Sequence, residues 1–175
     1  RFRADQLRAM GRATSGVRGM KFRAGDHTLA MGVVREGWDL VTVTDEGYAK
    51  RTDLAEWNTK GRAGYGVRAM KLVEERGSLV GAVVCQPEDT IFAIASNGVV
   101  IRTLVAQVRQ TSRDTMGVSL MGLPAGVTVV AVARSDAHED EEEFEPQDSE
   151  DSDPDSGSDH VTGEDEVSVD TGAQA

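Results

Sequence analysis

The chain has 175 residues with 19 Lys and Arg against 30 Asp and Glu, and this net charge of −11 argues by itself against a nucleic acid as partner. Position reverses that conclusion: residues 1–135 hold all 19 basic residues and 13 acidic ones, a net charge of +6, whereas residues 136–175 hold 17 acidic residues and no Lys or Arg. The single cysteine excludes an intrachain disulfide and a cysteine zinc cluster, and no apolar run approaches the roughly 18–20 residues that cross a bilayer.

Residues 1–22 contain the first copy of an internal repeat. The heptapeptide Gly16–Phe22 (GVRGMKF) returns as Gly66–Leu72 after 50 residues and, degraded, as Gly117–Leu123 after a further 51. Arginines stand 15 residues before each Gly-Val, at Arg1, Arg51 and Arg102, and four residues before it, at Arg12, Arg62 and Arg113. This agreement indicates a repeat protein. Because the chain opens inside the pattern and without Met, we expect a fragment whose other units lie upstream.

Residues 23–72 form the first complete unit. Leu29–Val34 is an apolar, β-branched run that predicts a strand, and Leu40–Arg51 reads as strand, two-residue turn at Glu46-Gly47, and strand. Asp53–Asn58 has room for a helical turn, and the Gly-Val-Arg segment predicts a closing strand. The unit therefore supplies about four short strands in about 50 residues.

Residues 73–123 repeat this order, with predicted strands at Leu79–Val84 and along Ile91–Arg102. Asn97-Gly98 predicts a type I′ hairpin turn, and Val105–Gln110 allows another helical turn. Cys85 lies in an apolar stretch and is expected to be a small buried hydrophobe. Val127–Ala133 is the predicted closing strand of the segment 124–135.

The predicted fold is all-β, a propeller-like array with four short strands per blade. It comprises a partial β-pinwheel over 1–135, made of a blade remnant at 1–22, blades at 23–72 and 73–123, and a closing strand at 124–135. Residues 136–175 are too acidic and too poor in apolar residues to form a core, so we expect a disordered tail. This polyanion either competes with DNA for the basic part or only solubilises the chain.

Positive charge follows the repeat. Residues 1–21, 50–71 and 102–113, the basic segments, carry 15 of the 19 basic residues and only three acidic ones. Stacked repeats align equivalent positions, so we expect Arg12 beside Arg62 and Lys21 beside Lys71, in a stripe suited to a polyanion backbone. The candidate DNA-binding residues are Arg8, Arg12, Arg18, Lys21, Lys50, Arg51, Lys60, Arg62, Arg68, Lys71, Arg102, Arg109 and Arg113.

The kind of contact expected is to phosphates, with tolerance of base sequence, as in proteins that bend or wrap DNA. No recognition helix, zinc finger or basic zipper is present for base readout. Tyr48, Trp57 and Tyr65 are too few for a stacking platform and are expected in the core. No catalytic constellation, phosphate-binding loop or metal-ligand cluster stands out, so we predict no catalytic residue and no cofactor in this segment.

The segments Gly11–Phe22 and Gly61–Leu72, with the hairpins Thr44–Gly47 and Ala95–Gly98 that each lead to an arginine, resemble the blade signature of the C-terminal domain of the bacterial DNA gyrase A subunit. The resemblance covers residues 1–135 and implies a six-bladed β-pinwheel whose basic edge wraps a DNA duplex. It further implies a cytoplasmic, chromosome-associated type II topoisomerase that uses ATP and magnesium for negative supercoiling, with the gyrase B subunit and a second gyrase A subunit in an A2B2 assembly. The breakage-reunion tyrosine and the family's Gln-Arg-Arg-Gly-Gly-Lys-Gly box are absent, so this segment alone cannot cleave DNA.

Two alternatives remain open: the equivalent domain in the A subunit of topoisomerase IV, which resembles the same pattern, and a non-enzymatic propeller-like module for protein interaction. Within the DNA hypothesis, the third copy has Ser119 and Gly122 where the earlier copies have Arg and Lys. Terminal repeats are often atypical. We therefore expect DNA contact to be strongest over the first two copies and to fade toward Leu123, with Arg109 and Arg113 as residual contacts.

Overall fold

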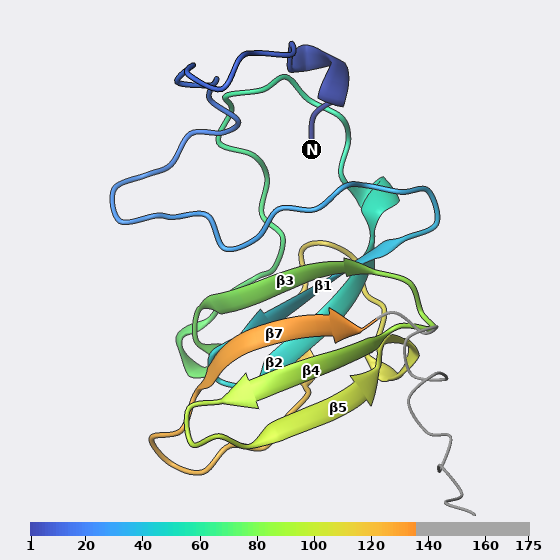
Figure 1. Ribbon diagram of the computed structural model, residues 1–175. Helices are drawn as coiled ribbons and strands as arrows, with labels where there is room; N and C mark the ends of the chain where they lie inside the picture. Colours follow the sequence, from blue (N-terminus) through green and yellow to red (C-terminus); the bar gives the residue numbers. More distant parts are fainter. Residues whose placement is uncertain (136–175) are drawn as a thin grey trace, which may run out of the picture. The chain divides into compact units, whose positions relative to one another are not determined.

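The computed structural model describes residues 1–135, and the predicted acidic tail at 136–175 lies outside them. The described residues form two antiparallel sheets and four single-turn 3-10 helices, with no α-helix among them (Figure 1). The prediction of an all-β fold is confirmed. The predicted boundaries between blades stay a prediction, although each sheet takes strands from more than one unit.

The first sheet has the strand order β3-β1-β2-β6. The hairpin of β1 (Asp39–Thr44) and β2 (Tyr48–Asp53) is the one that the sequence predicts. On one side it pairs with β3 (Leu79–Cys85) of the following unit, and on the other with β6 (Val118–Ser119) of the third Gly-Val copy. Strands some 70 residues apart thus share one sheet, and this pairing joins the units.

The second sheet repeats this arrangement one unit later, with the order β5-β4-β7. The hairpin of β4 (Thr90–Ala95) and β5 (Val100–Leu104) confirms the second predicted hairpin. β7 (Val129–Ser135) pairs with β4 as β3 pairs with β1, and it is the predicted closing strand displaced by two residues.

The hairpin turns differ from the prediction. The N–H of Gly47 donates to the carbonyl of Thr44 at 3.0 Å, and the N–H of Gly98 donates to that of Ala95 at 2.9 Å. Only the glycines of these turns have positive φ, 77° and 86°. A type I′ turn needs positive φ at both central residues, so that prediction for Asn97-Gly98 is wrong, and a longer loop ending on a left-handed glycine takes its place.

Three predicted strands are not formed: Leu29–Val34 and the Gly-Val-Arg segments of the first two copies. Their counterparts β3 and β6 are strands because the edges of the β1–β2 hairpin pair with them. No hairpin among the described residues pairs in this way with Leu29–Val34, Gly16 or Gly66. Local β propensity without the edge of a hairpin as partner therefore leaves these segments outside the two sheets.

The core lies between the two sheets. Val41, Val43 and Ala49 of the first sheet pack in one buried cluster with Ile91, Ala93 and other side chains of the second. Cys85 belongs to this cluster and is fully buried, as predicted, and burial raises the pKa of its thiol to about 12.

The sheets approach closely at β3 and β7. A Cβ added to Gly81 of β3 would lie 3.2 Å from Cβ of Val132, closer than most Cβ contacts, so a larger residue would push against the facing strand. In Figure 1, β3 and β7 run across the front of the two sheets next to one another.

Three of the four 3-10 turns in the described residues lie within the basic segments. η2 (Leu54–Glu56) and η4 (Val105–Gln107) are the two predicted helical turns, and they insert Leu54 and Val105 into the interior. η1 (Ala4–Gln6) and η3 (Glu74–Arg76) were not predicted. No helix within residues 1–135 has the length and apolar character to cross a membrane.

Candidate nucleic-acid interface

The predicted DNA-binding residues differ in exposure. Most are exposed: Arg8, Arg12, Arg18, Lys21, Lys60, Arg68, Lys71, Arg102 and Arg109. Three are half-buried: Arg51, Arg62 and Arg113. One, Lys50, is buried. The exposed group defines the basic surface that the chain offers to a ligand.

The basic segments of successive copies are joined by a repeated set of hydrogen bonds. The N–H of Lys21 donates to the carbonyl of Gly64 at 2.8 Å, and the N–H of Lys71 makes the same bond, at 3.0 Å, to Thr115. Each bond joins the lysine that follows one Gly-Val pair to the residue that lies two positions before the next Gly-Val pair. We call the contact between copies one and two the first junction, and that between copies two and three the second junction.

An arginine side chain crosses each junction. Nη1 of Arg62 donates to the carbonyl of Arg18 at 2.7 Å, and Nη1 of Arg113 donates to the carbonyl of Arg68 at 2.7 Å. The two residues that meet across each junction therefore occupy different positions in their repeats. Simple stacking predicted instead that equivalent positions would lie side by side. The crossing arginines hold the copies together, while Arg18 and Arg68 keep exposed side chains.

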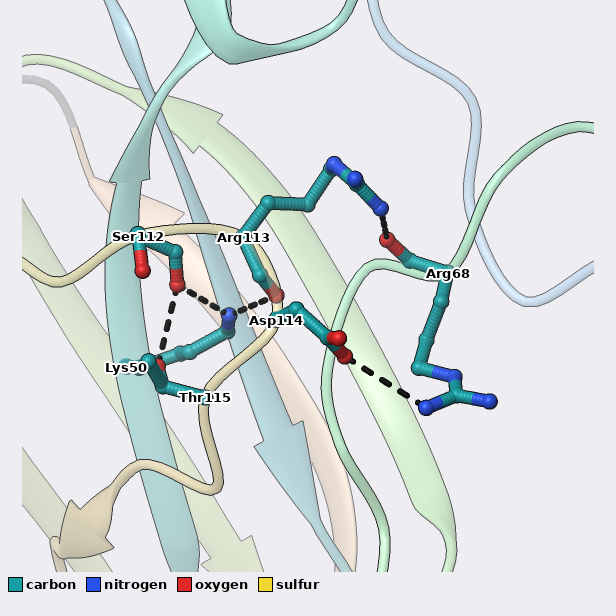
Figure 2. Close-up of polar contacts among 6 residues, drawn as sticks. All are labelled: Lys50, Arg68, Ser112, Arg113, Asp114 and Thr115. Carbon is teal, nitrogen blue, oxygen red and sulfur yellow. Dashed lines mark hydrogen bonds and ion pairs between the residues drawn. The ribbon is translucent and has the colours of Figure 1, made fainter.

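Lys50 corrects the predicted set. Its side chain is 1% exposed, and Nζ donates to the carbonyls of Ser112, at 2.9 Å, and of Arg113 (Figure 2). Burial lowers the pKa of Lys50, while the nearby Glu56 and Asp114 act in the opposite direction. A DNA phosphate has no access to an ammonium group held in this way, so Lys50 positions the loop of the third copy instead.

Arg51 also has an internal role. Its Nη1 lies 3.3 Å from Oδ2 of Asp39, whose Oδ1 accepts a hydrogen bond from Nε2 of Gln110 at 3.1 Å. Asp39 is buried, and burial raises the pKa of its carboxyl despite the adjacent guanidinium. Arg51 was predicted to be a surface charge, because nothing in the local sequence pattern distinguishes a paired arginine from an exposed one.

A shallow hollow of about 490 Å³ lies at the first junction, lined by Arg18, Met20, Lys21, Phe22 and Tyr65. Tyr65 is 61% exposed, so its predicted place in the core is wrong. Lys21 Nζ lies 5.8 Å from the centre of its ring, and the guanidinium of Arg23 lies 6.0 Å away. Arg23 is absent from the predicted set of DNA-binding residues. The exposure of Tyr65 could have been inferred from the glycines on either side of it, which are typical of a surface turn.

The other two aromatic residues that were predicted in the core, Trp57 and Tyr48, are less exposed than Tyr65. Trp57 is 8% exposed, which confirms its predicted place in the core. Tyr48 is half-buried, with the guanidinium of Arg76 4.6 Å from the centre of its ring. No group of three or more metal-ligating side chains occurs in the part of the chain that the structure describes.

Comparison with known proteins places this repeat in a family. The model of the DNA gyrase C-terminal domain, beta-propeller, matches residues 1–35, 39–86 and 89–136. The chain belongs to this family. The three matched segments each contain one copy of the Gly-Val repeat, in agreement with the repeat found in the sequence.

Relatives in the family include the DNA gyrase A subunits of Streptomyces coelicolor, 56% identical over 131 residues, and of Mycobacterium leprae, 50% identical over 131 residues. Each match covers 75% of this chain, but only 15% and 10% of the respective relative. The chain therefore spans a small part of the length of these family members.

Solved structures agree with the fold. A DNA gyrase A C-terminal domain structure is 26% identical, with a TM-score of 0.68 over 76% of this chain and 45% of that one. The C-terminal domain of a DNA topoisomerase IV gives a TM-score of 0.73 over 78% of this chain and 43% of that one, at 23% identity. The latter likeness concerns the fold alone.

Proposed function

We propose that this chain binds and wraps double-stranded DNA as the C-terminal part of a DNA gyrase A subunit. The observation that carries the proposal is the pair of hydrogen-bonded junctions, which hold exposed Arg and Lys side chains of successive repeats in a fixed order. Family membership and identities of 50–56% to gyrase A subunits support it.

The mechanism is electrostatic. Exposed cations at the junctions contact phosphates and release counterions, so affinity falls with salt by a log–log slope of about 0.9 per phosphate neutralised. Bending a short duplex costs on the order of 1–6 kcal/mol, which several such contacts offset. Hydrogen bonds between the repeats keep the cations in fixed positions. This rigidity is needed because a flexible array of cations would adapt to straight DNA instead of bending it.

The wider assembly follows from the proposal. The chain acts within an ATP-hydrolysing type II topoisomerase of the bacterial cytoplasm, together with the gyrase B subunit and a second gyrase A subunit. ATP and magnesium serve that assembly at sites other than the residues described above. The part played by this segment is to set the path of the DNA, and strand cleavage belongs to other parts of the enzyme.

The two alternatives make different predictions. Topoisomerase IV shares the fold, but the sequence relatives at 50–56% identity are gyrase A subunits. A protein-interaction module without a DNA role predicts no salt-dependent binding to duplex DNA. Neither alternative accounts as well for basic side chains gathered at the junctions.

The test is a filter-binding titration of the full-length subunit with a linear duplex over a salt series. The matched variant has Arg18, Lys21, Arg68 and Lys71 changed to Gln, all four side chains being exposed. We expect the log–log slope to fall by about 0.9 for each phosphate that is no longer neutralised, about 3.6 if all four side chains bind one. An unchanged affinity and slope would reject the DNA role.

A further inference from the structure

The two junctions share their backbone geometry but differ in charge. At the first, the N–H of Arg62 donates to Oε1 of Gln6 at 3.0 Å. At the second, the N–H of Arg113 donates to Oε2 of Glu56 at 2.6 Å. The same bond recurs one repeat later, and its acceptor changes from a neutral amide to a carboxylate.

A second acidic residue enters at the next position. Asp114 lies 51 residues after Ala63 and takes its place beside the crossing arginine. Oδ1 of Asp114 is 3.4 Å from Nη1 of Arg68, and the two side chains are 60% and 63% exposed (Figure 2). The carboxylate therefore lies on the surface and accompanies one of the exposed arginines.

Matched positions allow the two junctions to be compared directly. The first consists of Gln6, Arg18, Lys21, Lys60, Arg62 and Ala63. The second consists of Glu56, Arg68, Lys71, Thr111, Arg113 and Asp114. The first set has four basic side chains and no acidic one, whereas the second has three basic and two acidic ones.

We infer that Glu56 and Asp114 weaken the DNA contact at the second junction, so that a duplex is held mainly at the first. The inference rests on the proposed function, because it concerns the same surface. A carboxylate beside a phosphate path repels it, and Asp114 also competes with phosphate for Arg68. The DNA contact therefore already weakens at Arg68, within the second copy. The loss of basic residues in the third copy alone would place this weakening later in the chain.

A purely structural role for these carboxylates predicts something different. Glu56 and Asp114 both act to raise the pKa of the buried Lys50, which means that they favour its charged form. If that were their only role, neutralising them would lower stability and leave DNA affinity unchanged. Affinity and stability must therefore be measured on the same variants.

The experiment exchanges the charges of the two junctions in the full-length subunit. E56Q/D114N makes the second junction resemble the first, retaining a hydrogen-bond acceptor at 56 and the side-chain shape at 114. We expect duplex affinity to rise about threefold to tenfold and the log–log salt slope to steepen by up to about 1.

The reciprocal variant is Q6E/A63D, which moves the two charges to the first junction, with Q6E/A63N as the control that lacks one of them. Ala63 has φ of 60°, a region that Asp and Asn tolerate, so neither substitution strains the backbone. We expect Q6E/A63D to lose affinity about threefold to tenfold. Q6E/A63N should lose about half as much on a logarithmic scale.

The outcomes separate the two claims. Salt-dependent binding by the unaltered subunit, with no gain in E56Q/D114N and no loss in Q6E/A63D, would overturn the inference and leave the proposed function in place. A full-length protein that shows no salt-dependent binding would overturn both. If thermal unfolding shows E56Q/D114N to be misfolded, Q6E/A63D decides alone: lost affinity supports the inference, and unchanged affinity overturns it.

Discussion

At the residue scale, the same side chain has opposite roles according to what surrounds it. Lys50 and Lys71 both belong to the basic segments, yet Lys50 is buried against two carbonyls while the side chain of Lys71 is exposed. An ammonium group that already donates inside the protein has no free contact to offer to a phosphate. Net charge therefore identifies the candidate binding segments, and burial decides which side chains within them are accessible to a ligand.

We predict that K50M and K71M separate these roles. K71M should reduce the salt slope of DNA binding, by at most about 0.9, and leave the unfolding midpoint unchanged. K50M should leave the slope unchanged and lower stability by about 1–3 kcal/mol, because two carbonyls lose their donor. Filter binding and urea denaturation on both variants measure the two effects, and a reduced slope in K50M would contradict the burial argument.

The buried lysine also predicts a pH dependence. Burial lowers its pKa in the folded state, so between that value and the ordinary 10.5 the unfolded chain binds more protons than the folded one. Stability contributed by this group therefore rises with pH through that window. Urea denaturation from neutral pH toward 10.5 should show the wild type gaining stability relative to K50M, and a constant difference would count against the assignment.

At the scale of elements, strands form where a partner edge exists. Both hairpins could be predicted from the sequence because alternation and a turn glycine are local signals. Leu29–Val34 has equal β propensity but pairs with no hairpin among the described residues, so propensity alone predicted it wrongly. The partner of β2, sited some 70 residues away in the third copy, could not be inferred from any local pattern.

The repeated glycine before each valine tests this element pairing. Gly16 and Gly117 have nearly equal φ, 72° and 77°, but only Gly117 is enclosed: an added Cβ would lie 2.6 Å from the carbonyl oxygen of Ala49. A Cβ added to Gly16 would meet no atom within 4 Å beyond its neighbours in the chain. G16A should cost about 1–2 kcal/mol for the left-handed backbone, and G117A should cost a further 1–3 kcal/mol or so for steric overlap. Equal losses in urea denaturation would mean that β6 does not pack on β2 as described.

A second pair of glycines tests the approach of the two sheets. G81A places a Cβ 3.2 Å from Val132, whereas G122A meets nothing within 4 Å. We expect G81A to lower the unfolding free energy by about 1–3 kcal/mol and G122A to change it little. Comparable stability of the two variants in urea would show that β3 and β7 have room to separate.

At the scale of the whole molecule, repeat phase and charge were sufficient to predict the fold class and the basic segments, and the resemblance of the repeated signature to a known domain was sufficient to predict the family. They were insufficient to show which copies meet, because a repeat interval does not reveal that the end of one copy contacts the start of the next. The roles of Lys50, Tyr65 and Asp114 all depend on that arrangement. The sequence therefore located the candidate surface, and the structure was needed to divide it into two junctions of different charge.

The central claim is that exposed cations at the junctions wrap DNA without taking part in its cleavage. The most direct test changes Arg18, Lys21, Arg68 and Lys71 together to Glu in the full-length subunit, reconstituted with its ATPase partner, and measures supercoiling and DNA cleavage side by side. We predict loss of ATP-dependent negative supercoiling with cleavage retained and an unchanged unfolding midpoint. Undiminished supercoiling by this folded variant would contradict the account.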